Sequence, residues 1–161
     1  MNRVNRILFH AEYQHALEQI QLWERERKFC RHTLAHFLDV ARLAYIRSLE
    51  KGLDVKKDVI YAAALLHDIG RHKQYEDGTP HEVASADLAD KILPDCSYSR
   101  EEQAQIRQAI LGHRSAQGGE CADVLGRLLY RADKASRNCF ACAARADCHW
   151  PDEKMNMEIR D

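Results

Sequence analysis

The chain has 161 residues, a formal net charge of −1 and a pI near 6.7, so it has no overall basic field of the kind that attracts nucleic acid. No apolar run approaches the roughly 20 residues of a membrane span, and the N-terminus lacks the apolar centre and cleavage site of a signal peptide. We therefore expect a soluble, cytoplasmic, one-domain protein with neither a nucleic-acid nor a membrane partner.

Apolar periodicity predicts about six helices and no sheet, hence an all-α fold. Residues 5–27 form a charged amphipathic pattern, with packing positions at Leu8, Leu17, Ile20 and Trp23. A second helix is predicted over 30–50. A third, over 55–69, is apolar nearly all round and stops at Gly70, which is typical of the central helix of a bundle.

Two capping signals mark the starts of later helices. Thr79 is predicted as an N-cap, with Pro80 as the first helical residue and Glu82 completing a capping box. Ser99 and Glu102 repeat the capping box for a helix that runs to about His113, and a sixth helix is predicted over 122–136. We expect residues 1–137 to form the helical domain and residues 138–161 to form a short Cys-rich tail packed on it.

Histidines and aspartates share the apolar faces of several predicted helices. His36 lies four residues before Val40, and Asp133 lies four residues after Leu129. By the same spacing, His113 follows Ile110 and Ile106, and His81 shares a face with Ser85, Leu88 and Ile92. His67 and Asp68 end the central apolar run, so separate helices each direct a polar side chain inward.

A lone inward histidine is usually a hydrogen-bonded core residue, and a lone aspartate near a helix end is usually a cap or a surface ion pair. Several imidazoles and two carboxylates around one interior differ, because their joint desolvation is hard to offset without a cation. This donor set suits iron, manganese or zinc, so the sequence predicts a metal site.

The order of these residues resembles the HD superfamily of metal-dependent phosphohydrolases. "HFLDVARLA" matches the first-His helix, "LLHDIGR" the His-Asp motif and "LYRADKASR" the closing Asp helix, over roughly residues 28–137. The additional histidines in "GTPHEVASA" and "AILGHR" make the chain similar to dinuclear members, among them the bacterial HD-type hydrolases of diadenosine tetraphosphate. Arg71 after the motif and the cysteine tail depart from those hydrolases.

The resemblance implies a pair of divalent cations, with iron expected first and manganese or zinc next. One would bind His36, His67, Asp68 and Asp133; the second would bind His81 and His113, with Asp68 bridging. A hydroxide bridging two metals would attack the phosphate ester or anhydride of a nucleotide or dinucleotide in line. The expected partner is therefore a phosphorylated small molecule, and the chain could form a homodimer.

Basic residues next to these positions could bind phosphate oxygens and stabilise the leaving group. These are Arg71, Arg114 and Lys134, for which ordinary surface charge is the alternative. His32, one turn before His36, could replace it as a ligand or bind substrate in the pocket.

The tail "NCFACAARADCHW" spaces Cys139, Cys142 and Cys148 as C-x2-C-x5-C. Three interpretations stay open: reduced thiols, a structural zinc, or an iron–sulfur cluster. The fourth ligand could be Cys30, Cys121 or His149, whereas Cys96 has no partner nearby in sequence.

Two other functions also remain open. Some proteins with this fold are di-iron oxygenases with a similar ligand set, and a non-catalytic sensor could use the cysteines to report metal or redox state. Basic residues beside the expected ligands favour the phosphohydrolase.

Overall fold

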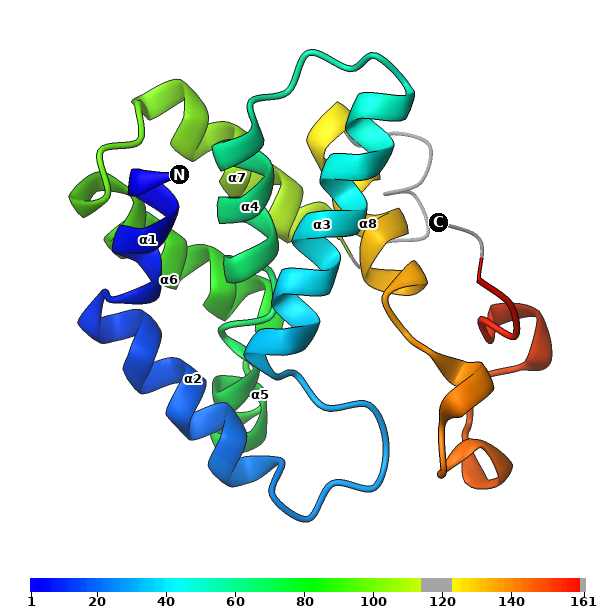
Figure 1. Cartoon of the computed structure of the whole chain (residues 1–161). Coiled ribbons are helices and arrows are strands. Elements are labelled where there is room, and N and C mark those ends of the chain that lie inside the picture. The colour runs from blue at the N-terminus through cyan, green and yellow to red at the C-terminus, as the bar shows by residue number, and fades with distance from the viewer. Residues whose placement is uncertain (114–122, 160–161) are drawn as a thin grey trace.

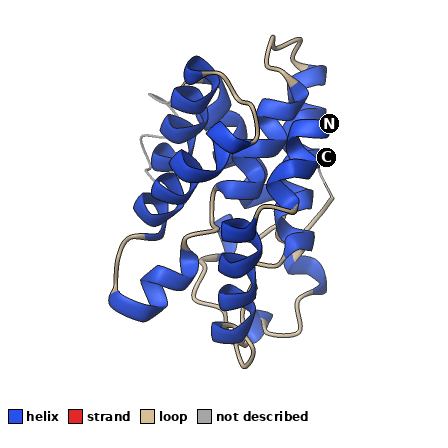
Figure 2. Ribbon diagram, turned by 90° about the vertical axis from the view of Figure 1, so that its left-hand side faces the viewer, coloured by secondary structure: helices blue, strands red, loops and turns tan. Residues whose placement is uncertain are grey.

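The computed structural model describes residues 1–113 and 123–159, and within these ranges the regular elements are helices, with no strand (Figures 1 and 2). The α-helices are α1 (Asn2–Leu8), α2 (Ala11–Trp23), α3 (Leu34–Glu50), α4 (Lys57–Leu66), α5 (Arg71–Asp77), α6 (His81–Asp95), α7 (Arg100–Gly112) and α8 (Val124–Ala135). Three short 3-10 turns follow, namely η2 (Cys139–Ala141), η3 (Arg145–Asp147) and η4 (Asp152–Lys154). The all-α prediction is confirmed.

Helix α4 forms the centre of the bundle, as its apolar sequence predicted. It packs against α3 and α7 and also contacts α1, α6 and α8. Three consecutive alanines, Ala62 to Ala64, are fully buried. Because their side chains are small, they allow several neighbouring helices to approach the α4 backbone closely, and they cost little side-chain entropy on burial. The last turn of α4 is therefore surrounded by the helices that carry the other inward polar residues.

The prediction of one helix over residues 5–27 was wrong. The chain breaks between α1 and α2, where the imidazole Nδ1 of His10 accepts a hydrogen bond from the Glu12 amide at 3.2 Å and caps α2. This break lets α1 pack against α4 while α2 packs against α5 and α6. Trp23, predicted to be a packing residue, is 52% exposed, with its ring centroid 6.1 Å from that of Tyr75.

Helix α4 ends at Leu66, three residues before its predicted end, and His67 and Asp68 lie in the turn that follows. The short helix α5 was not predicted. It ends at Asp77, and its C-cap residue Gly78 has a φ of +82°, which suits glycine.

Helix α6 begins one residue later than predicted. Pro80 takes the N-cap position with no side-chain cap, and the predicted Thr79–Glu82 capping box does not form. The Thr79 amide instead donates to the Asp77 carboxylate at 2.9 Å, which favours the preceding turn.

The second capping box is confirmed. The Ser99 hydroxyl accepts from the Glu102 amide, and the Glu102 carboxylate accepts from the Ser99 amide at 3.0 Å. The Thr33 hydroxyl accepts from the His36 amide and caps α3, and the Asp123 carboxylate accepts from the Gly126 amide and caps α8, so each of these helices starts at a defined residue. None of the described helices is both long and apolar enough to cross a membrane.

Candidate metal centre

Five elements deliver six polar side chains to one buried point. The six side chains are His36 from the first turn of α3, His67 and Asp68 from the turn after α4, His81 from the start of α6, His113 from the end of α7 and Asp133 from α8. Each of the six is at most 7% exposed. Residues that are distant in the sequence therefore meet because the helices around α4 all end or begin at the same level.

The candidate ligands form two groups that share Asp68, and within each group the ligand atoms lie within 4.8 Å of one another. The first is His36, His67, Asp68 and Asp133; the second is Asp68, His81 and His113. In the first group, His67 Nε2 lies 3.4 Å from Asp68 Oδ2, and His36 Nε2 lies 3.5 Å from Asp133 Oδ1. In the second, Asp68 Oδ1 lies 2.9 Å from His81 Nε2 and 3.5 Å from His113 Nε2. Each carboxylate oxygen of Asp68 thus faces one group.

The rings are held from behind through their Nδ1 atoms. His67 Nδ1 bonds the Ala64 carbonyl at 2.7 Å, and His113 Nδ1 bonds the Ile110 carbonyl at 2.5 Å. Because a carbonyl oxygen only accepts, Nδ1 carries the proton, and the Nε2 lone pair of the neutral ring points into the site. His81 makes the equivalent contact with Gln74 Oε1 at 2.8 Å. This arrangement is typical of metal-binding histidines.

Three buried atoms of the site, His67 Nε2, His81 Nε2 and Asp133 Oδ1, have no hydrogen-bond partner among the described residues. A buried polar atom without a partner costs about 1–3 kcal/mol. All three atoms are electron-pair donors that face the two groups. A divalent cation would satisfy them together, so these residues fit a metal ion.

Asp68 and His36 both have pKa values below their ordinary ones, so both are deprotonated electron-pair donors near neutral pH. Burial would raise the pKa of Asp68, but the contacts with His67, His113 and His81 hold it well below its ordinary value. Burial lowers the pKa of His36 to about 2, with the Arg137 charge acting in the same direction.

The pKa of His67 is instead raised. Burial would lower its pKa, but the charges of Asp68 and Asp133 raise it to about 9. A proton and a metal ion compete for the same Nε2 lone pair, so the carboxylates that attract the proton would attract a cation equally.

Two of the predicted phosphate-binding residues, Arg71 and Lys134, lie at the edge of the site. Arg71 Nη2 contacts both Asp68 oxygens at 3.2 and 3.3 Å, and Lys134 Nζ lies 2.8 Å from Asp133 Oδ2. Arg114 lies outside the described residues, as does Cys121. Sequence reasoning missed Arg137, whose Nη2 lies 3.1 Å from His36 Nε2 and 3.7 Å from Asp133 Oδ1. Its position one helical turn after Asp133 was the available signal.

His32 lies beside the site rather than in either group of ligand atoms. Its Nε2 is 3.4 Å from Asp68 Oδ2, while its Nδ1 is 2.5 Å from the carboxylate of Glu24, which is 3% exposed. Glu24 also accepts the His32 amide at 2.6 Å and the Tyr75 hydroxyl at 2.6 Å. Burial would raise the pKa of Glu24, but these hydrogen bonds and the His32 charge lower it to about 2. The sequence offered no signal for Glu24, because its role depends on a contact between the α2–α3 loop and α5.

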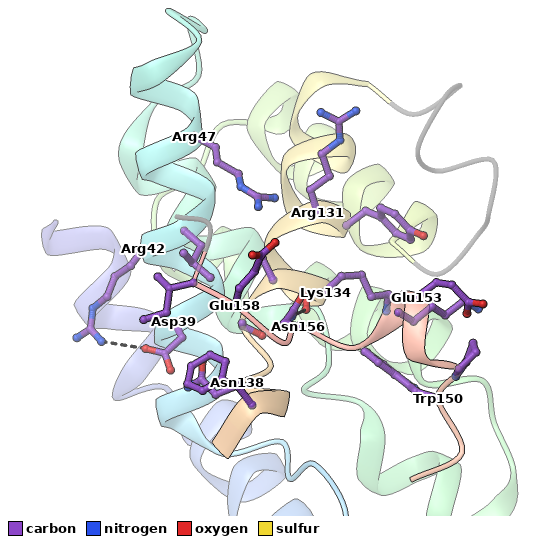
Figure 3. Close-up of a pocket in the computed structure, with 18 of the residues that line it drawn as sticks. Asp39, Arg42, Arg47, Arg131, Lys134, Asn138, Trp150, Glu153, Asn156 and Glu158 are labelled. Atoms are coloured by element: carbon purple, nitrogen blue, oxygen red, sulfur yellow. Dashed lines mark hydrogen bonds and ion pairs between the residues drawn. The ribbon is translucent and has the colours of Figure 1, made fainter. Parts of the chain in front are cut away.

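A cavity of about 620 Å³ opens onto the two groups, and a second of about 1090 Å³ adjoins it. Lys134 and Trp150 line both cavities. Figure 3 shows the second cavity between α3, α8 and the C-terminal segment, with Arg47 and Arg131 at one end and Trp150 at the other. The two cavities thus share part of their lining, and the second is large enough for more than a phosphate group.

The four described cysteines of the predicted second site, Cys30, Cys139, Cys142 and Cys148, all line the smaller cavity. All four are free thiols, and none belongs to the two groups of ligand atoms within 4.8 Å. The structure thus places these four cysteines around one cavity, with no three of their sulfurs within 4.8 Å of one another.

The model of the HD domain family matches residues 33–138. An uncharacterized protein of Clostridium beijerinckii is 46% identical over 159 residues, which is 99% of each chain. Ribonuclease Y of Nitratidesulfovibrio vulgaris is 35% identical over 108 residues, which is 67% of this chain but only 18% of the ribonuclease. The crystal structure of a predicted HD superfamily hydrolase from an uncultured Thermotogales bacterium has a TM-score of 0.66 with 22% identity, covering 89% of this chain and 78% of the other. That likeness shows a shared fold.

Proposed function

Because this chain belongs to the HD domain family, we propose that it is a metal-dependent phosphohydrolase that acts on a phosphorylated small molecule of the nucleotide or dinucleotide class. The observation that carries the proposal is the position of Asp68 between two groups of buried ligand atoms. One carboxylate oxygen faces each group, so the residues can hold two cations side by side.

The ligands assigned are His36, His67, Asp68 and Asp133 for one cation, and Asp68, His81 and His113 for the other. A bound pair of divalent cations supplies a water whose pKa is lowered towards neutrality, together with positive charge for the phosphoryl oxygens. The chain contributes orientation, because the carbonyls of Ala64 and Ile110 fix two of the rings. It also contributes burial, which strengthens every electrostatic contact within the site.

Arg71 and Lys134 are assigned to the phosphate group. Arg71 lines the smaller cavity, its side chain is 19% exposed, and its buried Nε has no partner among the described residues, so it retains a donor. Lys134 lines both cavities. The positively charged side chains of Arg71 and Lys134 can contact phosphoryl or leaving-group oxygens, while the neighbouring carboxylates of Asp68 and Asp133 hold the metals.

The adjoining cavity suits the nucleoside part of the substrate. It is lined by Tyr130 and Trp150, whose ring centroids lie 5.6 and 5.8 Å from Lys134 Nζ. An aromatic face next to a cation provides a stacking surface for a base and a contact for a phosphate. Since both cavities share Lys134, one molecule could place its phosphate at the His–Asp groups and its base beside Trp150.

The test combines metal analysis with a hydrolysis screen of nucleoside mono-, di- and triphosphates, dinucleoside polyphosphates and short RNA. Phosphate release is measured for the wild type and for Asp68→Ala. We expect Asp68→Ala to lose activity and metal from both groups, because its carboxylate serves both. The matched control is Asp90→Ala, which removes a surface carboxylate 3.0 Å from Arg107 and should leave both measurements unchanged.

Activity retained in Asp68→Ala would refute the assignment. A wild type that contains two irons and hydrolyses none of the compounds would instead support the di-iron oxygenase. Cleavage restricted to RNA would extend to this chain the activity printed in the name of the ribonuclease Y relatives.

A further inference from the structure

Four of the cysteines that the proposed function leaves unused, Cys30, Cys139, Cys142 and Cys148, come from two segments joined by direct contacts. In Figure 1 the chain after α8 forms an arm beside the loop that connects α2 and α3. Lys28 Nζ of that loop lies 2.5 Å from Asp147 Oδ2 of the arm, and the rings of Phe29 and His149 lie 5.3 Å apart. Lys28 and Phe29 immediately precede Cys30 in the sequence, and Asp147 and His149 flank Cys148. The two contacts therefore bring the loop cysteine near the cysteines of the arm.

The spacing of the arm cysteines matches its 3-10 backbone. Cys142 N donates to the Cys139 carbonyl at 3.2 Å, Arg145 N to the Cys142 carbonyl at 3.2 Å, and Cys148 N to the Arg145 carbonyl at 3.1 Å. The turns η2 and η3 are each followed by a cysteine, Cys142 and Cys148, which takes extended backbone at the end of the turn. Cys139, Cys142, Arg145 and Cys148 all line the smaller cavity together with Cys30.

The arm buries few side chains. Among described residues 138–159, only Cys139 and Ala144 are buried, and the regular structure consists of three turns of three residues each. Such a segment buries too little apolar surface to offset the entropy of ordering it. Segments of this kind are commonly held by a metal centre, whose binding energy then contributes to folding.

The surroundings of the thiols are positively charged. Arg27, Arg137 and Arg145 line the same cavity, and Arg27 Nε donates to the Cys30 carbonyl at 2.9 Å. A metal centre with four thiolate ligands carries net negative charge, which nearby guanidinium groups stabilise.

The arrangement of the four cysteines favours a cluster over a single ion. A tetrahedral zinc binds each sulfur at about 2.3 Å, which places the sulfurs about 4 Å from one another. Within residues 1–113 and 123–159, the groups of three or more candidate ligands gathered within 4.8 Å are the two His–Asp groups, and neither contains a cysteine. In a four-iron cluster each thiolate binds a different iron, so the four sulfurs need not gather as closely as they do around one ion. We propose that Cys30, Cys139, Cys142 and Cys148 bind an iron–sulfur cluster.

The test is an anaerobic purification of the full chain, with reconstitution by iron and sulfide if needed. Iron, zinc and acid-labile sulfide are counted, and the reduced protein is measured by electron paramagnetic resonance. Labile sulfide is the decisive readout, because metal ions at the His–Asp groups contribute none. We expect the wild type to contain labile sulfide, Cys30→Ala and Cys142→Ala to lose it, and Asp68→Ala to retain it.

Cys96→Ala is the matched control. Cys96 is 1% exposed in the apolar core at the end of α6 and does not line the cavity, so this variant should keep all of its labile sulfide. Reconstituted wild type without labile sulfide would refute the cluster even if a cysteine variant failed to fold. Zinc that is retained by the wild type and lost in Cys142→Ala would replace the cluster by a single-ion site.

Discussion

The turn between α4 and α5 depends on the absence of a side chain at Gly70. A Cβ atom at this position would lie 2.3 Å from the Ser85 amide nitrogen, and 2.6 and 2.7 Å from the carbonyl carbon and Cβ of Ala84. The first two of these are backbone atoms of α6, which cannot move as a flexible side chain can. The Gly70 amide also donates to the Ser85 hydroxyl at 2.8 Å. Gly70→Ala must therefore push α6 away from the turn that carries His67 and Asp68.

The expected loss of stability follows from two opposing effects. Overpacking of this kind costs about 1–3 kcal/mol, and the upper value applies because backbone must shift. Replacing glycine with alanine recovers about 0.4–1 kcal/mol by restricting the unfolded chain. The net loss is about 2 kcal/mol. For a chain of this length each kcal/mol lowers Tm by about 2–4 °C, so Gly70→Ala should melt about 4–8 °C below the wild type.

The assay is thermal unfolding followed by circular dichroism, with Gly112→Ala as the matched control. Gly112 is the last residue of α7, and a Cβ there would meet nothing within 4 Å. That variant should keep the wild-type Tm or exceed it, because alanine is the better helix former. If Gly70→Ala melted within about 2 °C of the wild type, the close approach of α6 would not be a real constraint.

Two further variants test the candidate site. His81→Ala should lower the Mn²⁺ stoichiometry of metal-depleted protein from two to one in equilibrium dialysis, because only the second group contains His81; an unchanged stoichiometry would exclude that group. Glu24→Gln should flatten the dependence of Tm on pH. Since the pKa of Glu24 is about 2 in the fold against an ordinary 4.5, its ionised form stabilises the protein above about pH 4.5, and this contribution is lost as the pH falls towards 2. Parallel Tm curves for wild type and variant over that range would contradict the interaction with His32.

Local patterns were sufficient for the helical core and its inward polar residues. The side-chain spacing along a helix depends only on helix geometry, so the positions of His36 and Asp133 relative to their apolar neighbours predicted which way they face. Burial at 7% and 6% agrees with that prediction. The Ser99 capping box was also readable, because it is a contact between residues three apart.

Features that depend on contacts between distant segments were not readable. Across the break at His10, α1 packs on α4 whereas α2 packs on α5 and α6, and Glu24 is buried by its contacts with His32 and Tyr75. No residue spacing records the helix packing or the contact with Tyr75, since these join segments that the sequence separates by about fifty residues or more.

The sequence by itself therefore determined the fold class, the central helix and which polar residues of the candidate site face the interior. Only the tertiary structure decided which atoms meet: that Asp68 stands between two groups of ligand atoms, that Arg137 reaches His36, and that the cysteines line the same cavity. The reason is physical. Helix periodicity assigns a face to each residue, whereas the distance between residues on different helices depends on how all the helices pack together.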